Sequence, residues 1–218
     1  MNAVTQNEGI AVGSTISQAD ANALKAGDVV GGGFYAGQIR QADGLYILVV
    51  APKDGGEHDD APWHTSTQRI DDARSFFDGR ANTAAMVRAG VALAVWASGL
   101  NVNGFNDWYL PARDELEVVY RNLKPTTEEN YVYRAGDNPS SVPAGYPYTA
   151  DTPTQTPVVA FQSDGAEAFD DESWYWTSTQ SESLSSYAWG QAFGLGSQNN
   201  NLKDNEFRAR AVRRMKVQ

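Results

Sequence analysis

The closing part of the chain decides the fold. Residues 174–214 read WYWTSTQSESLSSYAWGQAFGLGSQNNNLKDNEFRARAVRR. Three short runs have strand character: Trp174–Thr177, Ser186–Phe193 and Phe207–Arg214. In the middle run, one alternating set is Tyr187, Trp189, Gln191 and Phe193, and the other is Ala188, Gly190 and Ala192. This period of two is typical of a strand between two different environments. Because the links carry Ser, Gln, Asn and Gly, the stretch predicts a rigid sheet with a polar-aromatic surface.

Composition indicates a globular protein with a real core. The chain has 218 residues, of which 41% are hydrophobic and 20% charged, which separates it from disordered sequences. Its six Trp and ten Tyr exceed what a core needs, and their polar tips favour half-exposed binding positions. A net charge of −10 argues against nucleic acid or an anionic membrane as the partner.

The beginning of the chain is polar and small. It lacks the basic and apolar regions of a secretory signal, and no apolar run reaches the ~20 residues of a membrane span. We therefore expect a soluble protein made in a cytosol. Residues 1–32, which end in Gly31 and Gly32, are expected to form an arm and linker that could serve for attachment, and residues 33–218 the domain.

Local patterns predict one hairpin and two helices. Asp43-Gly44 between the apolar runs 34–40 and 45–51 is a hairpin signal. A first helix is expected over residues 81–99, ending at Gly99. A second should follow Pro111, because Leu116, Val119, Tyr120 and Leu123 have helical spacing. Pro125 would end this second helix.

Residues 125–165 form a long irregular excursion. They include six of the nine prolines, and loops of this length tend to be functional or disordered. No Lys or Arg occurs between residues 135 and 202. The same stretch holds eight Asp and Glu residues. We therefore expect it to pair with some of the arginines of the last strand, which are Arg208, Arg210, Arg213 and Arg214.

Catalytic and metal chemistry find little support. The acidic loop 54–60 with His58, followed by His64, invites a metal hypothesis, but its spacing fits no familiar ligand set. With no Cys, two His and no GxSxG motif, the best catalytic candidates would be those histidines or the acids of 170–172. We therefore expect no enzyme, no metal site and no cofactor.

An ordered set of motifs resembles the Lcl C-terminal domain family. The motifs are Asp107–Pro111, the Asp114-Glu115-Leu116 triplet, Tyr175–Thr179 and the arginine-rich strand 208–214. They cover about residues 81–216 by their spacing. Residues 34–53 also look like the front part of prophage versions of this domain. The family is named for a bacterial collagen-like adhesin and is abundant in phage genomes.

The resemblance implies an α+β, C-type-lectin-like fold of the kind shared with formylglycine-generating enzymes. Two helices would pack on a small antiparallel sheet, and long irregular loops would present a binding face. The implied function is non-catalytic binding of a host surface receptor, glycan or protein, at a phage tail-fibre tip or on an adhesin.

Three departures from the family and its fold relatives matter. Ala112 stands where Thr or Ser is common, so the second helix should lack its N-cap hydroxyl. The absence of Cys excludes the chemistry of formylglycine-generating enzymes. The EPN-type triplet of calcium-dependent lectins is also missing, so calcium remains a possibility without support from any motif.

The receptor-binding residues that we expect on or beside the exposed face are Ser183, Ser185, Tyr187, Trp189, Gln191, Phe193, Gln198, Asn199, Asn200, Asn201 and Asn205. Aromatic rings supply contact area, and Ser and Asn supply adaptable hydrogen bonds. The aromatic residues of the middle strand fit a buried face equally well. Trp108, Leu110 and Trp176 are expected in the core.

The expected setting is a virion, with the protein made in the host cytoplasm. Its partners would be the receptor and other tail proteins, in a homo-oligomer that could be a trimer. Two alternatives remain open. One is a structural tail or capsid decoration protein without receptor binding. The other is an adhesin domain on a bacterial cell surface.

Overall fold

The computed structural model describes residues 15–218. In chain order its elements are β1 (Thr15–Ile16), α1 (Gln18–Ala23), β2 (Val29–Val30), β3 (Gly33–Gln41), β4 (Gly44–Val50), α2 (Lys53–Gly56), β5 (Glu57–Pro62), α3 (Gly79–Arg88), α4 (Ala92–Ser98), α5 (Arg113–Leu123), β6 (Ser141–Val142), the 3₁₀ turn η1 (Val159–Phe161), β7 (Trp174–Gln180), β8 (Tyr187–Ala192), β9 (Gln198–Leu202), β10 (Glu206–Arg210) and β11 (Val212–Val217). The fold is α+β, as expected.

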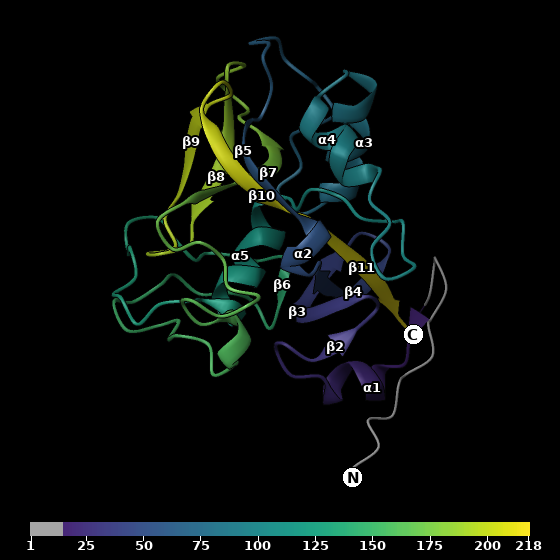
Figure 1. Ribbon diagram of the computed structural model, residues 1–218, viewed down its shortest axis with the longest axis vertical. Helices are drawn as coiled ribbons and strands as arrows, with labels where there is room; N and C mark the ends of the chain where they lie inside the picture. The colour runs from purple at the N-terminus through teal and green to yellow at the C-terminus, as the bar shows by residue number, and fades with distance from the viewer. Residues whose placement is uncertain (1–14) are drawn as a thin grey trace.

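Two sheets form the framework, where the family resemblance implied one small antiparallel sheet. The first has the order β1-β11-β4-β3-β2, with β6 paired to β3, and the second has the order β5-β10-β7-β8-β9. The last part of the chain joins them, since β10 lies in the second sheet and β11 in the first (Figure 1). Only the β1–β11 and β10–β7 pairs of the described sheets are parallel.

The first sheet contains the predicted hairpin and also takes in the expected linker. β3 and β4 pair from Gln41↔Gly44 upward, which confirms the Asp-Gly signal. β2 pairs with β3, and Gly31 and Gly32 turn between them at φ +55° and +83°. The glycines are thus a hairpin turn, because both positions need the left-handed region that glycine adopts without strain.

Residues 15–30 differ from the arm expected at the N-terminal end. β1 pairs with β11 over Ile16↔Val217, and the side chains of Ile16 and Ala21 are buried in the core. The boundary expected at residue 32 therefore does not separate an arm from the domain within the described chain. The rest of the expected arm, residues 1–14, lies outside the described residues.

The helices follow the sequence pattern, with one difference. The run expected as one helix over residues 81–99 is split into α3 and α4 at Gly90, whose φ is +75°. The helix expected after Pro111 is α5, and it ends at Leu123 just before Pro125. α5 packs on β3, β7 and β8, so it lies between the two sheets (Figure 1).

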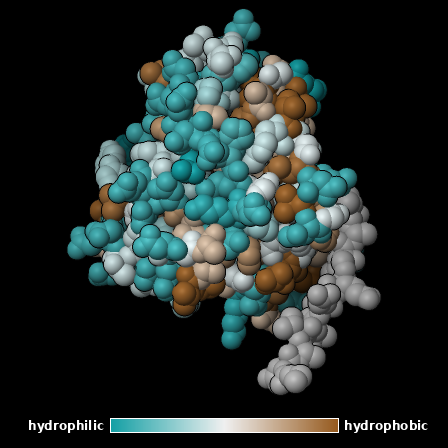
Figure 2. Space-filling model, in the orientation of Figure 1, coloured by the Kyte–Doolittle hydropathy of each residue, from teal (hydrophilic) through white to brown (hydrophobic). Residues whose placement is uncertain are grey.

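The core of the described chain consists of three clusters: one along α5 and the strands that it touches, one at α3 and α4, and one on the other face of the first sheet. Trp108, Leu110 and Trp176 are fully buried or nearly so, as predicted. The face of the molecule in Figure 2 is mainly hydrophilic, and its hydrophobic residues form small separate groups. The described surface on this side therefore shows no single large apolar patch of the kind that marks an obligate interface.

Candidate functional site: the β8–β9 surface and the start of α5

The buried hydroxyls of β7 fix the position of α5. Ser178 Oγ donates to Pro111 O at 3.2 Å, beside the bond from Ser178 N to the same oxygen at 2.8 Å. Thr179 Oγ1 accepts from Arg113 N at 3.0 Å and donates to Ser75 O at 2.8 Å. These bonds explain why a polar run lies inside the molecule, since each hydroxyl satisfies a backbone group that would otherwise be orphaned.

Thr179 and Glu115 together replace the missing N-cap of α5. Ala112 has no side-chain acceptor, so only the Glu115 half of a capping box exists, with Ala112 N donating to Glu115 Oε2 at 2.8 Å. Asp114 N donates to Phe76 O at 2.8 Å. The helix start expected to be weak is therefore held by contacts from residues distant in the sequence.

Glu115 is the electrostatic centre of this junction. It is fully buried and also accepts from Gly79 N at 3.1 Å and Tyr109 Oη at 2.9 Å. Burial raises the pKa of Glu115 to about 7, opposed mainly by Arg214, whose Nη1 lies 3.7 Å away. We assign Glu115 a structural role, because its oxygens are occupied by backbone and side-chain donors.

The terminal arginines pair with acids, in part as predicted. Arg208 contacts Asp170 at 3.2 Å and Arg210 contacts Glu167 at 2.5 Å, which confirms pairing with the acidic stretch. Arg213 and Arg214 instead use upstream acids, and Arg213 Nε lies 2.6 Å from Asp107 Oδ1. These arginines are mostly buried, so they serve the core and leave no basic surface.

The predicted recognition residues gather on the β8–β9 hairpin at the edge of the second sheet. The register pairs Gln191↔Gln198, Trp189↔Asn200 and Tyr187↔Leu202. Cross-strand partners share a face, so these six side chains lie on one face of the hairpin. That face is turned toward the start of α5, since Gln198 Nε2 donates to Arg113 O at 3.0 Å.

Two of the predicted contact residues are not on the surface. Phe193 is 0% exposed and stacks on Phe169 with ring centroids 3.9 Å apart. Gln191 is also buried, and its Oε1 accepts from Gln198 Nε2 at 3.1 Å. Expecting Gln191 on the exposed face was wrong, and for Phe193 the buried alternative is the correct one, because their face passes under α5 toward Tyr120 at this end of the strand.

The other predicted residues keep some accessibility, but they divide between different parts of the hairpin. Tyr187, Trp189 and Asn200 are half-buried on the α5 face, and Asn199 and Asn201 lie on the opposite face, exposed and half-buried respectively. Ser183, Ser185 and Asn205 lie in the adjoining turns, where Ser185 is half-buried and the other two are exposed.

Two of the asparagines are occupied by their own strand. Asn199 Oδ1 accepts from Asn200 N at 2.9 Å, and Asn201 Nδ2 donates to Asn199 O at 3.0 Å. The run expected as a loop is therefore the edge strand β9, with amide side chains bonded to the backbone. Because of these bonds, Asn199 and Asn201 are less free for a ligand than the sequence implied.

A guanidinium joins the surface that sequence reasoning did not identify. The Cζ of Arg113 lies 4.3 Å from the ring centroid of Phe76 and 5.1 Å from that of Trp189. The two rings meet edge to face at 5.8 Å. Because these three residues are far apart in sequence, only the packing of α5 on β8 brings them together. No local sequence signal pairs a residue of PARDEL with Trp189.

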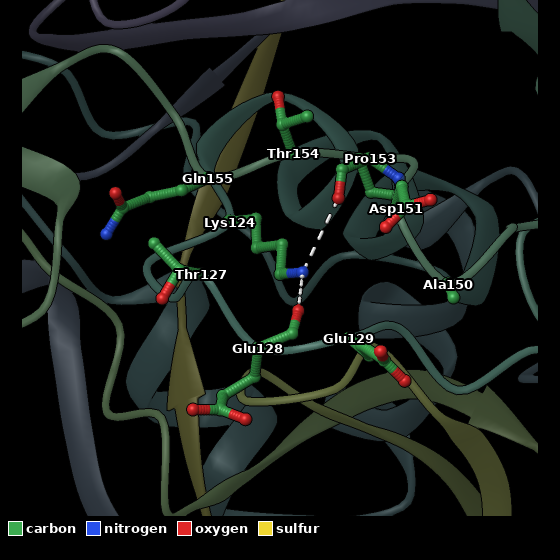
Figure 3. Close-up of a pocket in the computed structure, with 9 residues that line it drawn as sticks. All are labelled: Lys124, Thr127, Glu128, Glu129, Ala150, Asp151, Pro153, Thr154 and Gln155. Atoms are coloured by element: carbon green, nitrogen blue, oxygen red, sulfur yellow. Dashed lines mark hydrogen bonds between the residues drawn. The ribbon is translucent and has the colours of Figure 1, made fainter.

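A cavity of about 340 Å³ lies apart from this face, under the 125–165 excursion (Figure 3). Lys124 donates from Nζ to Glu128 O and to Pro153 O, and burial lowers the pKa of this ammonium. The carboxylates of Glu128, Glu129 and Asp151 point away from it. Lys124 thus ties two loop segments together, and the cavity lacks converging side chains for a ligand.

The metal hypothesis gains no residue cluster. Residues 57–60 belong to β5, and within residues 15–218 no group of three or more His, Asp or Glu side chains is placed to hold a metal ion. In the same part of the chain, every helix falls short of the length and apolar character that a membrane crossing requires.

The protein is thus an α+β domain in which the β8–β9 hairpin, at the edge of the second sheet, carries polar and aromatic side chains. The profile of the Lcl C-terminal domain family matches residues 62–213. The chain belongs to the Lcl C-terminal domain family. No match was found among curated proteins.

Among solved structures, the chain is similar to a fimbrial protein from Bacteroides ovatus ATCC 8483. The identity is 12% and the TM-score 0.40, over 77% of this chain and 35% of that protein. The chain therefore corresponds to about a third of the length of the fimbrial protein.

Proposed function

We propose that the protein is a non-catalytic recognition domain that binds a molecule on a host surface, glycan or protein, through the α5 face of the β8–β9 hairpin. The observation that carries this proposal is the half-buried pair Tyr187 and Trp189 on one face of β8, where Arg113 contacts the Trp189 ring. Trp, Tyr and Arg are the residue types that contribute most of the energy of binding interfaces. Here they stand on strands and a helix start, which hold them in place.

The rigid support favours recognition over loop-mediated capture. Thr179 and Glu115 lock the start of α5, and the hairpin register fixes Trp189 opposite Asn200. A preorganised surface loses little entropy when a ligand binds. We also propose the more specific features that the family resemblance implies. These are a C-type-lectin-like fold, a position at a phage tail-fibre tip and a homo-oligomer such as a trimer. An adhesin is the alternative setting.

A cell-binding experiment tests this function. Labelled protein is incubated with a panel of bacterial strains, and the double variant Tyr187→Ala, Trp189→Ala is expected to lose binding while it remains folded. The matched control is Tyr133→Ala, Tyr146→Ala, because these rings are 62% and 78% exposed on the long excursion. Circular dichroism at increasing temperature verifies folding of both variants. Loss of binding in the control alone would move recognition to the excursion and contradict the proposal.

A further inference from the structure

The Arg113 guanidinium is held rigidly with one side open. Phe76 and Trp189 lie over it, and its Nε is 3.3 Å from Asp114 Oδ1. Its terminal nitrogens, Nη1 and Nη2, have no hydrogen-bond partner among residues 15–218, and the side chain is 19% exposed. Unlike Arg210 and Arg213, whose three guanidinium nitrogens all have partners, Arg113 therefore has donors left for an outside molecule.

The geometry of those donors specifies an anion with two oxygens. A guanidinium presents paired N–H groups in a plane, and a carboxylate accepts both of them in a bidentate arrangement. Phe76 and Trp189 approach the guanidinium from adjacent sides, since their rings meet edge to face at 5.8 Å. These contacts restrict the side chain before the ligand arrives, so less side-chain entropy is lost on binding. Asp114 Oδ1 lies 3.3 Å from Nε without forming a hydrogen bond, and its other oxygen accepts from Ser140 Oγ at 2.7 Å. Asp114 therefore forms no hydrogen bond with the terminal nitrogens of Arg113.

The charge of the whole chain narrows the class of ligand. A net charge of −10 repels polyanions and acidic protein surfaces, whereas a single carboxylate on an otherwise neutral molecule is repelled far less. The half-buried rings of Tyr187 and Trp189 lie on the same face. They offer flat apolar area for the C–H side of a sugar ring.

We propose that Arg113 is the anchor of the recognition surface and binds the carboxylate of an acidic sugar, with the aromatic residues of β8 contacting the sugar ring. This inference rests on the proposed function and names its ligand chemistry. Neither Arg113 nor Phe76 was among the residues that the sequence predicted for binding.

The test compares a sugar acid with its own uncharged ester. N-acetylneuraminic acid, glucuronic acid, the methyl ester of each acid and N-acetyl-aspartate amide are titrated into ¹⁵N-labelled protein, with the tryptophan indole N–H signals as the readout. We expect at least one acid to bind and the matching ester to bind about tenfold more weakly or worse, as expected for loss of a charge-assisted pair. Equal binding of acid and ester, or no binding of either acid, overturns the inference. Tighter binding of the aspartate derivative than of both sugars overturns it in favour of a peptide ligand.

Variants separate charge from geometry. Arg113→Gln should weaken acid binding by about tenfold or more, and Arg113→Lys should restore only part of it, because lysine keeps the charge without the planar pair. Arg88→Gln is the matched control, since Arg88 is exposed and, among residues 15–218, forms an ion pair only with Asp72. Thermal unfolding of each variant verifies the fold. Binding by Arg113→Gln equal to that of the unaltered protein overturns the inference.

The cell-binding assay distinguishes failure of this inference from failure of the proposed function. If Arg113→Gln binds cells normally while the Tyr187, Trp189 double variant does not, the sugar-acid inference fails and recognition by this face stands. If the unaltered protein binds acidic sugars but no cells of the panel, the ligand site stands and the proposed host-surface function fails.

Discussion

β7 and β9 flank β8 in one sheet, and both are rich in hydroxyl and amide side chains. The side chains from Trp176 to Gln180 in β7 are fully buried, whereas every residue of β9 is exposed or half-buried. In β7 the polar groups bond to backbone from other segments, such as Pro111 O and Ser75 O. In β9 the side chains of Asn199 and Asn201 bond only within their own strand, as far as the described residues go. Polar residues along an edge strand such as β9 therefore lie at the surface, whereas polar residues along a central strand such as β7 hold other buried segments in place.

The largest test of this contrast is Gln180→Leu in β7. Gln180 Oε1 accepts from Ile70 N at 2.9 Å and from Lys203 Nζ at 2.7 Å. Leucine would leave a buried amide and a buried ammonium without that acceptor, so we expect the free energy of unfolding to fall by about 3 kcal/mol or more. Urea denaturation followed by tryptophan fluorescence measures the change.

Gln180→Glu is the matched control for that variant. Glutamate keeps the acceptor and adds a counter-charge for Lys203, and the Gln180 Nε2 that it replaces has no hydrogen-bond partner within the described residues. It should therefore be clearly more stable than Gln180→Leu near neutral pH. Equal losses for the two variants would show that shape, and not the polar contact, sets the requirement at this position.

The contrast also marks what a sequence can and cannot predict. The alternation around Trp189 correctly predicted a strand, but the face that it buries depends on where α5 packs, and Phe193 was misplaced for that reason. β9 was missed because Asn is depleted in strands, and an edge strand needs no apolar residues to pair. The Arg113 cluster joins residues 76, 113 and 189, so it depends on the tertiary fold and on no local pattern.

A pH experiment tests the contact between β7 and the residue after β9, in which Lys203 Nζ donates to Gln180 Oε1. Burial, aided by Arg69, lowers the pKa of Lys203 to about 8 from 10.5. Since the unfolded chain then holds this proton more tightly, stability should rise with pH between about 8 and 10.5, by up to about 3 kcal/mol. Lys203→Met lacks this contribution. The unfolding free energy of both proteins is measured at pH 7 and at pH 10. Because tyrosine titration affects both proteins, the change in their difference isolates the contribution of Lys203. A difference that is the same at both pH values contradicts the prediction.

A smaller effect is expected for Thr179→Val, which keeps the shape of the side chain. It removes the acceptor for Arg113 N and the donor to Ser75 O, so we expect a loss of about 2 kcal/mol. The start of α5 should open more often, which hydrogen exchange at the Arg113 amide detects. Ser185→Ala in the neighbouring turn provides the matched removal of a hydroxyl, and it should change neither stability nor exchange. Unaltered exchange at Arg113 would contradict the bracing role given to β7.

The smallest effect should come from Asn199→Ala in β9. The bond from Asn200 N to Asn199 Oδ1 is exposed, so water replaces it and the loss of stability should stay below about 0.5 kcal/mol. The variant also uncovers a backbone donor on a sheet edge, and free edges favour pairing between chains. Sedimentation velocity at increasing concentration should therefore show more self-association than in the unaltered protein, although the unfolding free energy scarcely moves. A loss of stability as large as that of Thr179→Val would mean that β9 braces the sheet as β7 does, and the distinction between edge and centre would fail.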